Sequence, residues 1–339
     1  MAKALLQGRI AAQFADLLRQ NLDESWDVLV WDPSKNSPQE FEEMAFDVDV
    51  IVGGQIPTDL WPATPNLKLF QIPWTGYDFC SPSSMPYGVP VCNCFEHEST
   101  VAEFVICGML EMKIKMHEMD KRFREKGWDG RQAGMSQFHG EIRGRTLGII
   151  GCGHIGVEVA KRAKAFDMRV IGLRRSLKNK IEYLDWLGTP DMLDKLLIES
   201  DFLLVGCDLN SETEGIIGES EFEKMRPESI IINVARGRVI QEEPFFKALR
   251  NKQIGGAVID VWYNYIGPDR KEIWPTNFPF HKLENVMLSA HESASTSEQV
   301  DRRWKFVASN ISEVIKGNPP QNLIFRGASP AKSAGPRST

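Results

Sequence analysis

Hydrophobic residues along the chain alternate between short strand-like runs and longer stretches with helical spacing. Residues 3–7 are predicted to form a strand, residues 10–21 an amphipathic helix, and residues 28–31 a strand that ends at Asp32-Pro33. Three further strands are predicted between proline-rich turns, over residues 48–53, 67–72 and 89–93. This alternation is typical of a parallel sheet flanked by helices.

A long helix is predicted over residues 98–123. Ser99 or Thr100 is the expected N-cap, and Glu103 would complete a capping box with Thr100. One face carries methionines at positions 109, 112, 116 and 119. Such a face is typical of a buried core or a subunit contact, which we favour over a flexible partner-binding surface.

The middle of the chain continues the same rhythm. Strands are predicted over residues 147–150, 169–173, 202–207, 230–234, 257–261 and 286–289, with helices over 155–166, 192–198 and 243–250. Six strands are the number expected of a complete dinucleotide-binding sheet. Residues 262–284 form a long aromatic and proline-rich connection, and residues 298–316 are predicted to be helical. Residues 327–339 have the composition of a disordered tail.

A glycine motif, Gly151-Cys152-Gly153-His154-Ile155-Gly156, stands between a predicted strand and a predicted helix. That context is the one a dinucleotide-binding turn requires. Gly151 would allow the tight turn, Gly153 the approach of a pyrophosphate to the backbone, and Gly156 close packing of helix and strand. The phosphates would face a helix N-terminus.

The end of the next strand indicates which dinucleotide binds. A carboxylate about 20 positions after the motif would bond the ribose 2′-hydroxyl of NAD, but this stretch reads Leu173-Arg174-Arg175-Ser176. Arg174 and Arg175 suit a 2′-phosphate better than a neutral diol, because guanidinium groups are charged and can bind it bidentately. The sequence therefore favours NADP(H) over NAD(H), unless both arginines are only a solvated strand end.

Composition narrows the class of protein. A net charge of −6 gives no electrostatic case for nucleic acid or an anionic membrane, and no run approaches membrane-spanning length. Six cysteines scattered mostly in apolar runs are typical of reduced thiols in the cytoplasm. Cys92, Cys94 and His97 form a local cluster, but no second pair stands at zinc spacing, so no metal site is expected.

Five motifs occur in an order that resembles the D-isomer-specific 2-hydroxyacid dehydrogenase family: GCGHIG, DLNSETEGIIG, NVARGRVI, AVIDVW and NVMLSAH. The resemblance extends from about residue 48 to residue 316. It implies two doubly wound α/β domains, Rossmann-like and flavodoxin-like, with the active-site cleft between them. Residues 1–98 and 293–326 would form the substrate domain, and residues 99–292 the dinucleotide-binding domain. It also implies a homodimer in which the helix starting near Val101 takes part.

The activity implied by the resemblance is hydride transfer between nicotinamide and a 2-keto or 2-hydroxy acid. Arg236 matches the family's active-site arginine, which can grip the substrate carboxylate and polarise the keto oxygen. His291 matches the catalytic histidine, which gives a proton to the carbonyl oxygen and accepts it in reverse. A salt-bridging arginine and a core histidine are the plain alternatives. Both residues follow predicted strands, 230–234 and 286–289, at the ends where such sheets bind ligands, which favours the catalytic interpretation.

Other matched positions imply binding roles. Thr75 and Gly76 match the turn whose amides hold the substrate carboxylate, and Thr100 matches a residue that approaches the nicotinamide. Further positions match cofactor contacts: His154, Ile155, Cys207, Val234, Ala235 and Asp260. Asp260 could instead cap its strand. An NADP-type member would be expected to reduce glyoxylate- or hydroxypyruvate-like acids.

Two positions depart from the family pattern. The usual glutamate five residues after the aspartate of the DV motif is Tyr265, and Ala290 replaces the proline before the histidine. A carboxylate beside an imidazole raises its pKa, so without one we expect reduction to fall off at lower pH than in glutamate-containing relatives. A formate dehydrogenase would share much of the pattern but is expected to carry asparagine where His97 stands. A non-catalytic cofactor sensor or corepressor is the other alternative, although binding alone does not require Arg236 together with His291.

Overall fold

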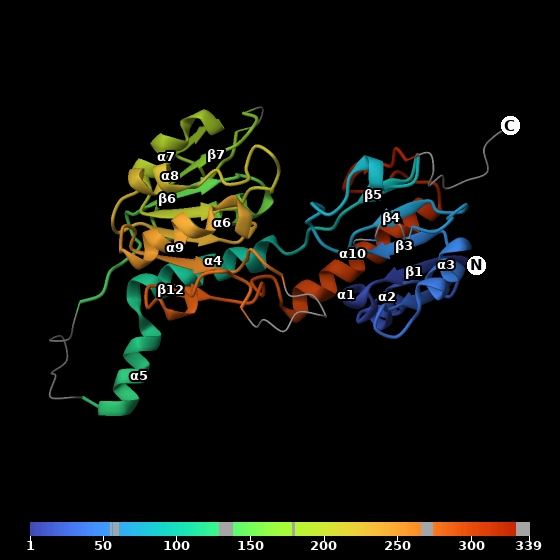
Figure 1. Ribbon diagram of the computed structural model, residues 1–339, viewed down its shortest axis with the longest axis horizontal. Coiled ribbons are helices and arrows are strands. Elements are labelled where there is room, and N and C mark those ends of the chain that lie inside the picture. The colour runs from blue at the N-terminus through green and yellow to red at the C-terminus, as the bar shows by residue number, and fades with distance from the viewer. Residues whose placement is uncertain (55, 57–60, 129–137, 178–179, 266–273, 330–339) are drawn as a thin grey trace. The chain divides into compact units, whose positions relative to one another are not determined.

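The computed structural model describes residues 1–54, 56, 61–128, 138–177, 180–265 and 274–329. The chain forms two compact units. Unit 1 contains Met1–His97 together with Thr296–Thr339, and unit 2 contains Glu98–Ser295. Each unit holds one sheet with helices packed along it (Figure 1).

The sheet of unit 1 is parallel except at one edge. Its strands are β1 (Ala2–Gln7), β2 (Trp26–Trp31), β3 (Val50–Gly53), β4 (Leu69–Gln71), β5 (Pro90–Cys92) and β13 (Leu323–Arg326). They lie in the order β13-β5-β4-β3-β1-β2, and only the edge strand β13 runs antiparallel to its neighbour β5. The five predicted strands are confirmed, and β2-β1-β3-β4-β5 is the flavodoxin-like order of a doubly wound sheet.

The helices of unit 1 come from both ends of the chain. They are α1 (Arg9–Ala12), α2 (Ala15–Asn21), α3 (Pro38–Phe46) and α10 (Ser297–Ile315). The single helix predicted over residues 10–21 is wrong, because the chain breaks between α1 and α2 at Gln13 and Phe14. Helix α10, predicted from its spacing, buries Trp304, Val307 and Ile311 against residues of β1 and β3. The C-terminal segment is thus part of the unit 1 core.

The sheet of unit 2 has seven parallel strands, where six were predicted. They are β6 (Thr146–Ile150), β7 (Arg169–Leu173), β8 (Trp186–Gly188), β9 (Phe202–Val205), β10 (Ile230–Asn233), β11 (Gly256–Ile259) and β12 (Val286–Leu288). Their order is β12-β11-β10-β9-β6-β7-β8. The additional strand is β8, a three-residue strand that pairs with β7 at the edge. The order reverses between β6 and β9, which is the point where such sheets bind ligands.

The helices of unit 2 are α4 (Glu98–Ile114), α5 (Met116–Lys126), α6 (His154–Ala165), α7 (Leu193–Glu199), α8 (Glu219–Lys224) and α9 (Glu242–Arg250). Short 3-10 turns span Pro190–Met192, Gly237–Val239 and Phe280–Lys282, and a further one, Pro82–Ser84, lies in unit 1. The predicted helix over 98–123 is interrupted at Lys115, whose φ of +58° separates α4 from α5. The predicted N-cap is also wrong, since α4 begins at Glu98 and includes Ser99 and Thr100.

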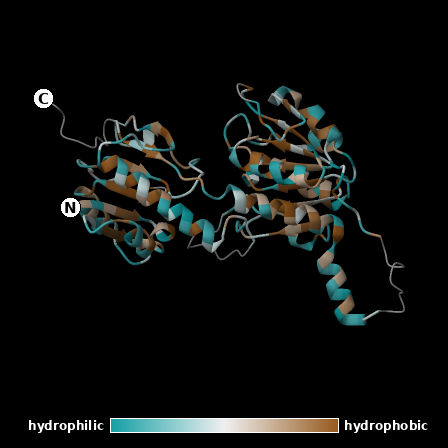
Figure 2. Cartoon of the chain, turned by 180° about the vertical axis from the view of Figure 1, so that it is seen from behind, coloured by the Kyte–Doolittle hydropathy of each residue, from teal (hydrophilic) through white to brown (hydrophobic). Residues whose placement is uncertain are grey.

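Both faces of each sheet are buried, which follows from the alternation of side chains along a strand. In β9, Leu203 and Val205 belong to one hydrophobic cluster of unit 2, and Phe202 and Leu204 belong to the other. Figure 2 shows the hydrophobic residues concentrated in the strands and the polar residues on the outer surfaces of the helices. The fold class predicted from the sequence, two doubly wound α/β domains, is confirmed.

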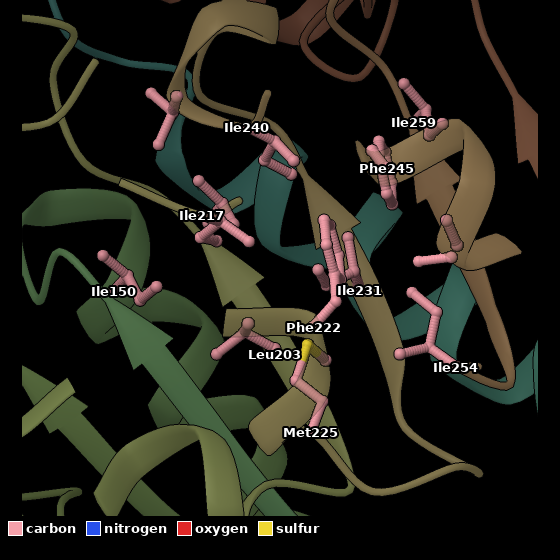
Figure 3. Close-up of a cluster of buried hydrophobic side chains, with 14 of the residues drawn as sticks. Ile150, Leu203, Ile217, Phe222, Met225, Ile231, Ile240, Phe245, Ile254 and Ile259 are labelled. Atoms are coloured by element: carbon pink, nitrogen blue, oxygen red, sulfur yellow. The ribbon is translucent and has the colours of Figure 1, made fainter. Parts of the chain in front are cut away.

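One of the two clusters in unit 2 packs aromatic rings from α8 and α9 onto the sheet. Phe222 and Phe245 stack with ring centroids 5.7 Å apart, and Phe280 contacts Phe245 at 5.6 Å. Figure 3 shows these helices covering Leu203, Ile231 and their neighbours on the strands. This cluster fixes the β9, β10 and β11 ends from which the candidate site is built.

The segment after β13 completes the fold of unit 1. The amides of Gly327, Ala328 and Ser329 bond to the carbonyl oxygens of Val89, Pro82 and Met85. The tail expected from Gly327 therefore begins with three residues held by backbone bonds, and residues 330–339 lie outside the described part. In the described residues, no helix is both long and apolar enough to cross a membrane.

Candidate active site

The glycine turn connects β6 to α6 and is shaped by close backbone contacts. Gly151 adopts a φ of +95°, in the region that favours glycine, and a Cβ there would lie 2.6 Å from the amide nitrogen of Cys207. A Cβ at Gly156 would lie 2.6 Å from the Gly151 carbonyl oxygen. Both glycines are therefore needed for packing within unit 2.

Gly153 stands in a different environment. No described atom lies within 4 Å of the position its Cβ would take, and it is the N-cap of α6, with His154 and Ile155 following in the first turn. The first amides of a helix lack intrahelical partners and attract anions. The open space beside Gly153 and this helix end fit the pyrophosphate of a dinucleotide.

Two arginines follow β7, beside the glycine turn. Arg174 is half-buried, and among the described residues it forms no ion pair with a carboxylate. Burial raises the pKa of the Cys152 thiol to about 12, and the charge of Arg174 opposes that rise, so the guanidinium lies within electrostatic range of the turn. Arg175 is exposed, and its Nη1 lies 4.0 Å from Oε2 of Glu212. Of the two cations, Arg174 is therefore the better candidate to bind a 2′-phosphate.

Other matched cofactor positions lie along α4 and at the strand ends of unit 2. Thr100 is buried in the first turns of α4, and Nδ1 of His154 lies 3.9 Å from Oε1 of Glu98 on that helix. Cys207 follows β9, and burial raises its pKa to about 11. This thiol is therefore protonated and inert at neutral pH.

The loop after β10 carries Arg236 and is held by a buried amide. Asn233 is 1% exposed; its Nδ2 donates to the Arg236 carbonyl oxygen at 3.1 Å, and its Oδ1 accepts from the Ala235 amide at 3.1 Å. Val234 and Ala235 are buried, and the half-buried guanidinium of Arg236 donates from Nη1 to the Ala235 carbonyl oxygen at 2.7 Å. Asn233 thus fixes the backbone from which Arg236 projects.

Asp260 organises the loop that carries His291. Its side chain is fully buried after β11. One carboxylate oxygen accepts from the Ser289 hydroxyl at 2.6 Å and from the Glu292 amide at 2.8 Å, and both oxygens accept from Ser293. His291 itself adopts a φ of +60°, which histidine tolerates better than most residues. The bonds to Asp260 on both sides of His291 hold it in this conformation.

The imidazole of His291 has two features that bear on its chemistry. Nδ1 lies 2.8 Å from the hydroxyl oxygen of Tyr265. Partial loss of hydration lowers the pKa of His291, the charge of Arg236 lowers it further, and the carboxylate of Asp260 opposes both. The structure therefore brings Arg236, Asp260 and His291 within electrostatic range of one another.

The matched turn of unit 1 follows β4. The Thr75 hydroxyl donates to the Cys94 carbonyl oxygen at 2.9 Å, and the Thr75 carbonyl oxygen accepts from Nδ2 of Asn93 at 2.9 Å. Both ring nitrogens of His97 lie 3.3 Å from the same hydroxyl. These bonds tie the half-buried Thr75-Gly76 turn to the segment after β5.

Residues 106–293, more than half of the chain, match the family described as D-isomer specific 2-hydroxyacid dehydrogenase, NAD binding domain. The chain belongs to the D-isomer-specific 2-hydroxyacid dehydrogenase family. It is 31% identical to a glyoxylate reductase of Korarchaeum cryptofilum over 89% of this chain and 91% of that protein. It is 33% identical to a glyoxylate reductase of Aeropyrum pernix over 90% of this chain and 91% of that protein.

A solved structure with the same fold is the NADPH-dependent glyoxylate/hydroxypyruvate reductase from Sinorhizobium meliloti in complex with NADP and malonate. It aligns with a TM-score of 0.74 and 22% identity, covering 97% of this chain and 99% of that one. As a member of this dehydrogenase family, the protein is an NAD(P)-dependent oxidoreductase that interconverts 2-keto and 2-hydroxy acids.

The 2-hydroxyacid dehydrogenase motifs predict ligand-binding positions, but three residues that hold the Arg236 and His291 loops received no role from the sequence. Asn233, Ser289 and Ser293 carry the hydrogen bonds that shape the Arg236 and His291 loops. Asn233 and Ser289 stand inside NVARGRVI and NVMLSAH, so a polar residue at a buried strand end was a signal available in the sequence. Ser293 had no comparable signal.

Proposed function

We propose that this dehydrogenase reduces small 2-keto acids of the glyoxylate and hydroxypyruvate type. The observation that carries the proposal is the placement of Arg236 and His291 on loops after β10 and β12, two parallel strands whose carboxyl ends lie at the same edge of the sheet. The glyoxylate reductases of Korarchaeum cryptofilum and Aeropyrum pernix support the substrate class. The alternative, a sensor that binds cofactor without turnover, would not need this pair.

The proposed roles follow from the chemistry of each group. The guanidinium of Arg236 binds the substrate carboxylate and polarises the keto oxygen. His291 donates the Nε2 proton of its imidazolium to that oxygen during reduction, and neutral His291 takes the proton back during oxidation. The bound nicotinamide supplies or accepts the hydride. The proposed role of Thr75 and Gly76 is to bind the substrate carboxylate through their backbone amides.

NADP(H) is the proposed cofactor, with NAD(H) as the alternative. The turn at Gly151, Gly153 and Gly156, with Thr100, His154, Ile155, Cys207, Val234, Ala235 and Asp260, forms the proposed dinucleotide site. Support for the phosphorylated form comes from Arg174, whose guanidinium lies near the glycine turn, and from Arg175 beside it. The Sinorhizobium meliloti reductase of the same fold holds NADP.

We also propose a homodimer. Helix α5 buries none of its residues, although Met116 is 67% exposed and Phe123 is 56% exposed. The ring of Phe123 contacts exposed Trp128 edge-on, with centroids 6.0 Å apart. Figure 1 shows α5 extending away from the rest of unit 2. Exposed apolar side chains on a helix that projects in this way are typical of a subunit contact.

Domain roles and cellular location complete the proposal. Residues 1–98 and 293–326 would hold the substrate, and residues 99–292 the dinucleotide. All six cysteines are free thiols, which supports function in the reducing cytoplasm.

The test measures oxidation of NADPH and NADH in parallel with glyoxylate, hydroxypyruvate, pyruvate and phenylpyruvate. We expect turnover with glyoxylate or hydroxypyruvate, and a large loss of kcat/KM in Arg236→Gln and His291→Asn. Lys247→Gln serves as a control, because Lys247 pairs with Glu243 on the exposed face of α9. Cofactor binding without turnover on any acid would contradict the proposal and favour the sensor.

A further inference from the structure

Tyr265 occupies the chain position at which the family pattern has a glutamate, and it contacts the proposed catalytic histidine. Its hydroxyl oxygen lies 2.8 Å from Nδ1 of His291. The two rings are tilted by 52°, with centroids 5.6 Å apart. Tyr265 follows β11 and His291 follows β12, so the contact joins loops from two adjacent strands.

The charges around the imidazole come from neighbouring loops. Loss of hydration is the largest effect and lowers the pKa of His291; Asp260, after β11, raises this pKa, and Arg236, after β10, lowers it. The carboxylate of Asp260 is already bonded to Ser289, Glu292 and Ser293. Within the described part of the chain, no carboxylate lies close enough to His291 to form an ion pair. The direct partner of Nδ1 is therefore a neutral hydroxyl.

A hydroxyl can accept a hydrogen bond as a carboxylate does, but it adds no charge. Proton transfer from Nε2 leaves a neutral imidazole that keeps its proton on Nδ1. A hydrogen-bond acceptor beside Nδ1 therefore suits both the imidazolium and the neutral imidazole, because Nδ1 carries a proton in each. It also fixes the ring so that Nε2 faces away from Tyr265, on the side where a substrate would be bound.

We infer, on the basis of the proposed function, that Tyr265 is a positioning residue for His291: its hydroxyl accepts the Nδ1 hydrogen and keeps Nε2 directed at the substrate, without the charge of a glutamate. The proton moves between Nε2 and the substrate oxygen, and Nδ1 keeps its own proton throughout. Because the partner is neutral, the imidazolium loses its proton at lower pH than it would beside a carboxylate. Reduction needs the imidazolium, so its rate declines from a lower pH.

Two substitutions separate charge from position. Tyr265→Glu places a carboxylate beside Nδ1, and we expect it to raise the midpoint of the decline in reduction by about 1 pH unit or more. Tyr265→Phe removes the hydrogen bond without changing charge. We expect it to lower kcat by about 2- to 10-fold with little change in KM, and to leave the midpoint nearly unchanged. Tyr265 is 51% exposed, so both variants are expected to fold.

Tyr263→Phe is the matched control. Tyr263 lies two positions earlier in the same loop, and its buried hydroxyl has no hydrogen-bond partner among the described residues. Its removal should change neither kcat nor the midpoint. An unchanged midpoint in Tyr265→Glu, or an unchanged kcat in Tyr265→Phe, would overturn the inference.

A second readout does not depend on turnover. The His291 imidazole is titrated by NMR in the wild type, Tyr265→Glu and His291→Asn, the last to assign the signal. We expect a higher pKa in Tyr265→Glu than in the wild type, with or without activity on the acid panel. If the wild type is inactive on the panel and the His291 pKa is still higher in Tyr265→Glu, the proposed substrate class is refuted and the inference about Tyr265 stands. An equal His291 pKa in both proteins would overturn the inference.

Discussion

Arg174→Gln is the substitution expected to change the choice of cofactor. Arg174 follows β7, is half-buried, and lies close enough to Cys152 of the glycine turn to lower the pKa of that thiol. Among described residues it forms no ion pair with a carboxylate, so its charge is available to a ligand. Glutamine keeps most of the length of the side chain and a hydrogen-bond donor but removes the charge. The change therefore tests the charge alone.

The expected loss of kcat/KM for NADPH follows from the energy of a hydrogen bond to a charged group. Such bonds contribute about 1.5–3 kcal/mol, and about 1.4 kcal/mol corresponds to a factor of ten. Arg174→Gln should therefore lower kcat/KM for NADPH by about 10- to 150-fold. NADH has no 2′-phosphate, so its kcat/KM should change little. Arg175→Gln should have a smaller effect, because Arg175 is more exposed and already lies 4.0 Å from Glu212.

The assay compares kcat/KM for NADPH and NADH at a fixed, saturating 2-keto acid. Arg169→Gln is the matched control: Arg169 starts β7 at the opposite end of the strand and pairs with Glu199 at 2.6 Å. It removes the same charge and should leave the ratio of the two cofactors unchanged. An equal loss with both cofactors, or an unchanged ratio in Arg174→Gln, would refute the assignment of the 2′-phosphate to this arginine.

Local patterns in the sequence predicted the strands and the glycine turn well. The buried strands of a parallel sheet are short apolar runs, and β6, β9 and β10 each stand out in this way. The three glycines were assigned by spacing, and the structure gives Gly151 its positive φ. Helix α3 also has a local signal in the sequence, a capping box between Ser37 and Glu40 with Pro38 at its start.

Other features depend on contacts that a local pattern does not contain. The left-handed residue Lys115 divides a helix whose spacing looks continuous. The approach of Gly151 to Cys207 arises only because β6 and β9 are neighbours in the sheet. The pairing of Tyr265 with His291 likewise requires that β11 and β12 lie side by side. The sequence identified Tyr265 as a missing carboxylate, but its role in positioning needed the tertiary structure.

Three further substitutions, one of them with a matched control, test the site and the assembly. Gly151→Ala should abolish measurable NADPH binding by fluorescence titration and destabilise unit 2, because the new Cβ would meet the Cys207 amide at 2.6 Å. Gly144→Ala is the control: Gly144 is also at positive φ, but no atom of the described residues lies within 4 Å of its Cβ position, so the change should cost only about 1–2 kcal/mol of backbone strain. Equal losses of stability in the two variants would contradict the clash at Gly151. Phe123→Glu should convert a dimer of 38.3 kDa chains into monomers in light scattering, and a wild-type monomer would refute the dimer.

Asp260→Asn replaces a carboxylate that accepts from two hydroxyls and two amides with a group that has one acceptor oxygen. The lost charge-assisted bonds should lower the free energy of unfolding by at least about 1.5–3 kcal/mol in urea titrations. Since Asp260 also raises the pKa of His291, any remaining reduction should decline from a lower pH than in the wild type. A stable variant with an unchanged pH profile would show that the buried carboxylate does not hold the histidine loop.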